Sequence, residues 1–203
     1  MKELKNQLYI NGEWCPASDG GTFQVLDPAT EKVITNVASG TVDDAMLCLK
    51  AAEYAFPLWA SKSPRERGEI LRKAFELITE KLDIIASLIT LENGKGASDA
   101  IGEARYAAEF FRWYAEEAVR SEGHLGMAPS TGARVLVHQK PAGISVLVTP
   151  WNYPAAMGAR KIGPALAAGC SVIIKPASET PLTMLALMPI LEKAGVPPGV
   201  VNV

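Results

Sequence analysis

The segment Pro-Trp-Asn-Tyr-Pro at residues 150–154 sets a polar amide between two prolines, directly after the apolar run Ile144–Val148. Because each proline ring fixes its own backbone torsion, we expect the Asn152 side chain to be held stiffly at the end of a strand. An amide NH2 held in this way can donate a hydrogen bond to an oxygen that becomes negative during a reaction. Alternatively, the two aromatic side chains belong to the core and Asn152 only caps the helix that follows. The residues alone leave both interpretations open.

A second polar turn, Lys-Pro-Ala-Ser-Glu at 175–179, follows the apolar run Ser171–Ile174. Between the two apolar runs, residues 155–168 favour a helix, and Gly169 stands where a left-handed C-terminal cap is expected. Strand, helix and strand in this order form a βαβ unit, whose ligands bind beyond the carboxyl ends of the parallel strands. The sequence therefore predicts that both turns lie at one edge of a parallel sheet.

Three motifs, PWNYP, RKIGPALAAGCSVIIKPASETP and AGVPPGVVNV, together resemble the aldehyde dehydrogenase superfamily. The likeness extends from about Tyr9 to the last residue. Arg160-Lys161 and Lys175–Ser178 most resemble the succinate-semialdehyde dehydrogenase branch. The resemblance implies NAD(P)-dependent oxidation of a small aldehyde that carries a carboxylate, such as succinate semialdehyde, to the acid. It also implies that the complete enzyme forms a homo-oligomer.

By this resemblance, cofactor-binding residues follow both strands. They are Thr149, Pro150, Trp151 and Asn152 after the first strand, and Lys175, Pro176, Ala177 and Ser178 after the second. In the family the asparagine of the first motif helps to hold the oxyanion of a thiohemiacetal, which makes Asn152 the expected catalytic residue of this chain. The lysine of the second motif, Lys175, would contact the cofactor ribose.

Arg160 is the expected substrate-binding residue. The semialdehyde-oxidising branch carries an arginine at this place in the helix after PWNYP, and a guanidinium can bind a carboxylate through two parallel hydrogen bonds. The alternative is an ordinary surface arginine on a helix.

The charges of the second turn favour NADP over NAD as the cofactor. In a dinucleotide-binding unit, an acidic residue just past the second strand bonds the 2′-hydroxyl of NAD and would repel the 2′-phosphate of NADP. Here the strand ends in the cation Lys175, and Ser178 stands where NAD-preferring relatives often carry glutamate. Glu179 leaves NAD open, since a small shift of the turn would bring its carboxylate to the ribose.

None of the three cysteines, Cys15, Cys48 and Cys170, stands in the Gly-Gln-x-Cys context of the family's nucleophile. The family's nucleophile and general-base glutamate lie downstream of the strand that ends this chain. We therefore expect the chain to be the N-terminal part of such an enzyme, inactive on its own. Its last strand, at 200–203, would leave a sheet edge and apolar faces exposed. The alternative is a non-catalytic fragment or binding module that docks cofactor or a full-length subunit.

Composition argues against several other classes of protein. Of 203 residues, 48% are hydrophobic and 21% charged, and a net charge of -2 offers no field for nucleic acid or an anionic membrane. The two histidines are far apart and the cysteines form no C-x-x-C pair, so we expect no metal site. Scattered cysteines and the lack of an apolar targeting segment indicate a cytoplasmic protein.

The expected fold is α/β, with short N-terminal strands and helices followed by a partial parallel βαβ dinucleotide-binding unit, as in a truncated aldehyde dehydrogenase fold. Residues 1–120 would form strands and helices of the cofactor-binding domain. Residues 121–142 would be a linker and an oligomerisation-type strand, in which 133–139 is an edge or subunit-contact strand. Residues 143–203 would be an incomplete βαβαβ unit.

Helical spacing and caps predict the helices before residue 120. Thr41 begins the first helix and Pro57 ends it, and a capping box of Ser63 and Glu66 begins the second. The buried face of the first helix would consist of Ala45, Leu49, Ala52 and Phe56.

The last of these helices, at about 99–119, is expected to place Glu103 on its solvent face. Its dense aromatic residues would form a binding surface or, as is commoner, pack in the core: Tyr106, Phe110, Phe111, Trp113 and Tyr114. Gly94-Lys95-Gly96 lacks the rest of a phosphate-loop pattern and is interpreted as a plain loop.

Overall fold

A parallel sheet of three strands lies at the centre of the fold. The computed structural model describes residues 4–203. The strands lie in the order β7 (Ile144–Val148), β8 (Ser171–Lys175) and β9 (Val201–Asn202). Two helices make the crossovers, α5 (Ala156–Ala168) and α6 (Leu182–Ala194). This arrangement confirms the predicted α/β fold with a parallel βαβαβ unit.

The register of the sheet brings the two polar turns together. Val148, the last residue of β7, stands opposite Lys175, the last residue of β8. The Thr149 N–H donates to the Lys175 carbonyl oxygen at 3.2 Å, one step beyond the strands. Both turns therefore begin at the same edge of the sheet, where the ligands of such folds bind.

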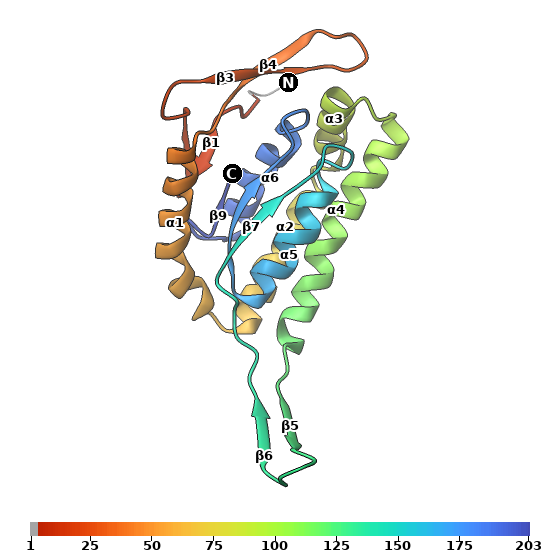
Figure 1. Cartoon of the computed structure of the whole chain (residues 1–203). Coiled ribbons are helices and arrows are strands. Elements are labelled where there is room, and N and C mark those ends of the chain that lie inside the picture. The colour runs from red at the N-terminus through yellow and green to blue at the C-terminus, as the bar shows by residue number, and fades with distance from the viewer. Residues whose placement is uncertain (1–3) are drawn as a thin grey trace.

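Short strands and long helices surround the sheet (Figure 1). Three antiparallel pairs are formed by β1 (Leu8–Ile10) and β2 (Glu13–Cys15), β3 (Thr22–Leu26) and β4 (Val33–Ala38), and β5 (His124–Met127) and β6 (Arg134–Val137). The helices before the sheet are α1 (Val42–Ala60), α2 (Pro64–Thr79), α3 (Leu82–Asn93) and α4 (Ala97–Glu117), the last continued by a 3₁₀ turn at Ala118–Arg120. Figure 1 shows α1 on one side of the sheet, α5 with α4 on the other, and the β5–β6 ribbon extending away from the body.

The edges of the sheet differ from the prediction. At β9, Tyr9 of β1 exchanges two backbone hydrogen bonds with Val203, of 3.0 and 2.9 Å, so the expected open edge there is wrong. The other edge strand, β7, leaves Val146 and Val148 exposed, at 68% and 58%. The other residues of this apolar run, Ile144, Ser145 and Leu147, are half-buried.

Helix caps follow the sequence closely, but one proline does not act as expected. Thr41 and Ser63 both form complete capping boxes, and Gly169 ends α5 in the left-handed region, with φ of 89°. Pro57 does not end α1, because the helix continues to Ala60. Its missing N–H costs α1 one hydrogen bond only three residues before the helix ends.

The buried face of α1 is also rotated from the one predicted. Its buried residues are Asp44, Cys48, Ala52, Ala55 and Trp59, whereas Ala45 is exposed. Two long-range contacts set this rotation: the Trp59 indole donates to the Leu166 carbonyl at 3.1 Å, and the Ser171 hydroxyl donates to the Ala52 carbonyl at 3.1 Å.

Helix α4 and the ribbon after it expose more apolar surface than the sequence suggests. Phe111 is fully buried, but Trp113 and Tyr106 are 61% and 47% exposed, so the prediction that all the α4 aromatics lie in the core is wrong. Strand β5 lies inside the segment interpreted as a linker.

Within residues 4–203, no helix is long and apolar enough to cross a membrane.

Candidate functional site

The turn between β7 and α5 carries Asn152, and other elements hold its backbone. The Trp151 carbonyl oxygen accepts two hydrogen bonds, from Asn93 Nδ2 at 3.0 Å and from Thr180 Oγ1 at 3.2 Å. The Asn152 carbonyl oxygen accepts from Lys95 Nζ at 3.1 Å. Side chains from the end of α3, the loop after it and the β8–α6 turn thus converge on two consecutive peptide groups.

Glu103 holds the other end of this turn. Its side chain is fully buried, and one carboxylate oxygen accepts the N–H groups of Ala155 and Ala156 at 2.9 and 3.3 Å. The other oxygen forms an ion pair with Lys95. The prediction that Glu103 faces solvent is wrong, because the first N–H groups of α5 need acceptors and this carboxylate supplies them.

The Asn152 side chain itself stays free. The residue is exposed, and its side-chain amide makes no hydrogen bond within residues 4–203. The N-cap residue of α5 is Ala155, not Asn152, and it makes no side-chain cap. The interpretation of Asn152 as a helix cap therefore does not hold, and its NH2 group remains available to donate to a ligand.

The turn after β8 presents the second group of predicted residues. Lys175 is exposed, and its ammonium donates only to the neighbouring Pro176 carbonyl, at 3.3 Å. Ser178 and Glu179 are exposed, Pro176 and Ala177 half-buried. Of the residues predicted in the first turn, Thr149 is buried, whereas Pro150 and Trp151 are exposed. The fold thus brings both predicted groups to one edge of the sheet.

A second buried carboxylate, Glu92, caps the helix after this turn. Its two oxygens accept the N–H groups of Leu182 and Thr183 at 2.6 and 2.8 Å. The pKa of Glu92 is raised to about 7, chiefly by burial and to a smaller extent by the negative charge of Glu103, against the opposing effect of the Thr183 and Leu182 hydrogen-bond donors. The Thr183 hydroxyl beside it is buried without a hydrogen-bond partner in the described chain.

Both helix N-termini at this edge are thus filled by carboxylates of the protein. In many dinucleotide-binding folds, the N-terminus of the first crossover helix binds the pyrophosphate. Here a phosphate at the start of α5 would meet Glu103. The free groups at this edge, Asn152, Lys175 and Ser178, suit amide and ribose groups of a dinucleotide better than its pyrophosphate.

Arg160 lies on α5 about 6 Å along the helix axis from its first residue. It is exposed, and its guanidinium carbon lies 5.7 Å from the centre of the Phe110 ring on α4. Phe110 in turn packs against Tyr106, with ring centres 4.7 Å apart. An arginine stacked in this way keeps its donors free at the rim of an aromatic surface.

Cys48 and Cys170 are buried, and Cys15 is half-buried. Cys170 is buried at the start of β8, the end of the strand opposite Lys175. Burial raises the pKa of the Cys48 thiol to about 11, and burial also raises the pKa of Cys15. Neither of these two thiols is activated as a nucleophile.

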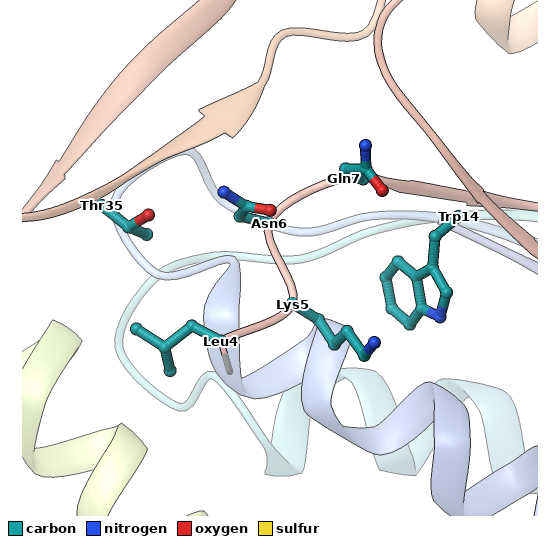
Figure 2. A pocket seen from close by; sticks show the side chains of 6 residues that line it. All are labelled: Leu4, Lys5, Asn6, Gln7, Trp14 and Thr35. Carbon is teal, nitrogen blue, oxygen red and sulfur yellow. The ribbon is translucent and has the colours of Figure 1, made fainter. Parts of the chain in front are cut away.

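Two hollows of the surface lie elsewhere. Figure 2 shows one of about 390 Å³ between the N-terminal segment, β2 and β4, where Lys5 stands 5.3 Å from the centre of the Trp14 ring. A second, of about 440 Å³, lies between the first hairpin and α1. Neither includes a predicted site residue. Within the described part of the chain, no three His, Cys, Asp or Glu side chains gather closely enough to hold a metal ion.

The anchoring residues were not predicted, although the sequence holds a signal for two of them. Glu103 falls at helical spacing between Ala100 and Ala107, and Glu92 lies three residues after Ile89, so each stands on the apolar face of its helix. A carboxylate on such a face must find buried donors. Lys95, in the segment interpreted as a plain loop, had no such signal.

Comparisons with known proteins agree on the family. The model of the aldehyde dehydrogenase family matches residues 14–203. The chain is 43% identical over 202 residues to "Succinate-semialdehyde dehydrogenase [NADP(+)] 1" of Schizosaccharomyces pombe, covering 100% of this chain and 41% of the relative. It is 44% identical over 200 residues to "Glutarate-semialdehyde dehydrogenase" of Pseudomonas putida, covering 98% of this chain and 42% of the relative.

A solved structure of an aldehyde dehydrogenase has the same fold over this part of its chain. The crystal structure of an aldehyde dehydrogenase from Brucella melitensis biovar abortus 2308 superposes with a TM-score of 0.95 at 46% identity, covering 100% of this chain and 42% of the other. The chain thus spans about two fifths of the length of the relatives it matches.

Proposed function

Because the chain belongs to the aldehyde dehydrogenase family, we propose that residues 1–203 supply the oxyanion-binding amide and part of the cofactor site of an NAD(P)-dependent enzyme. That enzyme oxidises a carboxylate-bearing aldehyde to the acid. The observation that carries the proposal is the free Asn152 side chain on a turn whose peptide groups are held from three sides.

The Asn152 amide stabilises the charge that develops during the reaction. When a thiolate adds to the aldehyde carbon, the carbonyl oxygen gains the negative charge, and a fixed N–H donor lowers the energy of that state. A dinucleotide held at this edge would supply the hydride acceptor, and water would then release the acid from the thioester. Asn152 Nδ2 has no partner to give up first within residues 4–203, so its hydrogen bond can go to the substrate oxygen.

NADP is the proposed cofactor. Lys175 and Ser178 are exposed on the same turn, and together they offer a cation and a hydroxyl to a ribose 2′-phosphate. The name of the S. pombe relative, which specifies NADP(+), supports this choice. Glu179 on the same turn is the group that would favour NAD.

Arg160 is the proposed receptor for the substrate carboxylate. Its guanidinium stands over Phe110, so the aliphatic part of a small aldehyde would lie along the aromatic surface while the carboxylate meets the cation. Succinate semialdehyde and glutarate semialdehyde, named for the two relatives above, both have this shape.

None of the three cysteines is proposed as the nucleophile, because Cys48 and Cys170 are buried and burial raises the pKa of the Cys15 thiol. We propose that residues 1–203 alone show no turnover.

We also propose a cytoplasmic location, and a subunit interface on the β5–β6 ribbon, where Leu125, Met127 and Leu136 are exposed.

A hybrid enzyme tests the proposal. Residues 1–203 replace the matching segment of the S. pombe relative, and turnover of succinate semialdehyde with NADP is followed at the nicotinamide absorbance. Asn152→Ala in this hybrid should lower kcat by about 10²–10³-fold with little change in KM for NADP. A rise of the KM for succinate semialdehyde with an unchanged kcat would contradict the oxyanion role of Asn152.

A further inference from the structure

Lys95 and Glu103 form an ion pair unlike the others in the described chain. The side chain of Glu103 is fully buried and that of Lys95 is 15% exposed. In the five other ion pairs of residues 4–203, each side chain is at least 32% exposed. A buried pair is costly to desolvate, so its presence calls for a reason beyond surface solvation.

All the polar contacts of this pair are directed at one turn. Glu103 accepts the N–H groups of Ala155 and Ala156. Lys95 donates to the Asn152 carbonyl at 3.1 Å and stands 3.9 Å above the centre of the Tyr153 ring. The ion pair thus binds one carbonyl in the first half of the turn, through Lys95, and two amides in the second half, through Glu103.

These contacts fix the backbone on both sides of Asn152. A peptide group is planar, so holding its carbonyl oxygen holds the whole plane. Asn93 and Thr180 hold the plane before the Asn152 α-carbon through the Trp151 carbonyl, and Lys95 holds the plane after it. With both planes fixed, the direction in which the Asn152 side chain leaves the backbone is fixed as well.

We propose that Lys95 and Glu103 are positioning residues that aim the Asn152 amide at the reacting oxygen, an inference that rests on the proposed function. Neither side chain touches substrate. Losing the pair therefore lowers the rate of the chemical step more than it weakens binding, because a misplacement of a reacting group by about 1 Å can cost on the order of 10²-fold in rate.

A double-mutant cycle in the hybrid enzyme tests this. Lys95→Met keeps the length of the side chain and removes its charge. We expect it to lower kcat by about 10–10²-fold, with KM for NADP within about twofold. In an Asn152→Ala background, where there is no amide left to aim, the same change should lower kcat by less than about twofold. Arg72→Met, which breaks the exposed pair with Glu76 at 3.3 Å, is the matched control and should leave kcat unchanged.

The outcomes separate the two proposals. If Lys95→Met lowers kcat equally in both backgrounds, the ion pair does not act through Asn152 and the inference is overturned. If Asn152→Ala alone leaves kcat unchanged, the proposed function fails instead.

A measurement on the 203-residue chain needs no turnover. Glu103→Gln and Lys95→Met should each raise the hydrogen-exchange rates of the Ala155 and Ala156 amides by about tenfold or more, whereas Arg72→Met should not. Unchanged rates at both amides would overturn the inference even if a variant hybrid did not assemble.

Discussion

The two turns at the carboxyl edge of the sheet both lead into a helix capped by a buried carboxylate, but they differ before that helix begins. In the β7–α5 turn, the carbonyls of Trp151 and Asn152 and the amides of Ala155 and Ala156 are all bound by side chains. In the β8–α6 turn, Ser178 is exposed and its backbone N–H has no partner in the described chain. A group that meets charge in a transition state must be aimed in advance, whereas groups that bind a cofactor can settle as it arrives.

The anchors of the two turns differ as well. Glu103 caps α5 and is neutralised by Lys95, whereas Glu92 caps α6 and forms no ion pair within residues 4–203. Burial raises the pKa of Glu92 to about 7. The second anchor therefore responds to a change of pH near neutrality.

Removing the first anchor should have the largest effect. Glu103→Ala leaves Lys95 buried without a counter-charge and two α5 amides without an acceptor, so the free energy of unfolding should fall by about 3–5 kcal/mol. Urea unfolding of the 203-residue chain measures it. Glu179→Ala, on the exposed turn, is the control and should change stability by no more than about 0.5 kcal/mol. Equal losses in the two variants would remove the contrast between the turns.

The second anchor should make stability depend on pH. Burial raises the pKa of Glu92 from 4.5 in the unfolded chain to about 7 in the folded one. The folded state therefore binds the proton more tightly than the unfolded chain does. The stabilisation that this proton gives to the folded state is fully present below pH 4.5 and is lost as the pH rises through 7. The loss is on the order of 3 kcal/mol.

Unfolding curves from pH 4.5 to 8 for the parent chain and Glu92→Gln isolate this effect, because glutamine stays neutral. The free energy of unfolding of the parent chain, relative to that of Glu92→Gln, should fall as the pH rises through this interval. A difference independent of pH would show that Glu92 is ionised throughout.

Arg160 extends the comparison to the helix that follows the fixed turn. Arg160→Ala in the hybrid should lower kcat/KM for succinate semialdehyde relative to butanal by about 10–10²-fold, since a charge-assisted hydrogen bond contributes about 1.5–3 kcal/mol. Arg105→Ala, an exposed arginine on α4, is the control. Equal losses for the two aldehydes would rule out recognition of the carboxylate.

The exposed turn should yield the smallest effect. Ser178→Glu places a carboxylate where the 2′-phosphate is proposed to bind, so the ratio of kcat/KM for NADP over NAD should fall by about tenfold, or 1.4 kcal/mol. Glu179→Gln tests the neighbouring position. If Glu179→Gln alone shifts the ratio, the ribose lies beside Glu179 and the assignment of Ser178 is wrong.

Local signals explain how much of this molecule its sequence could predict. The helix start at Thr41, the capping box at Ser63 and the glycine after α5 are set by neighbouring residues, and all three were predicted correctly. The failures came from contacts distant in the chain. Glu103, for example, is buried because α5, some fifty residues later, needs its carboxylate.

In the candidate site, too, residues from contiguous motifs were predicted and residues brought close only by the fold were not. Asn152 and Lys175 come from motifs contiguous in sequence, and the sheet register brings the ends of their strands together. The residues that hold the Asn152 turn come from α3, α4, the loop between them and the β8–α6 turn, and only tertiary packing brings Lys95 to Asn152. Spacing along the chain could not predict that contact.

Hydrogen exchange of the unmodified 203-residue chain, resolved by amide, tests the contrast between the turns most directly. The Ala155 and Ala156 N–H groups, bound by a buried carboxylate, should exchange at least about 10²-fold more slowly than the Ser178 and Glu179 N–H groups after correction for intrinsic rates. Similar rates for the two pairs would contradict the fixed turn, and with it the reason for assigning the oxyanion to Asn152.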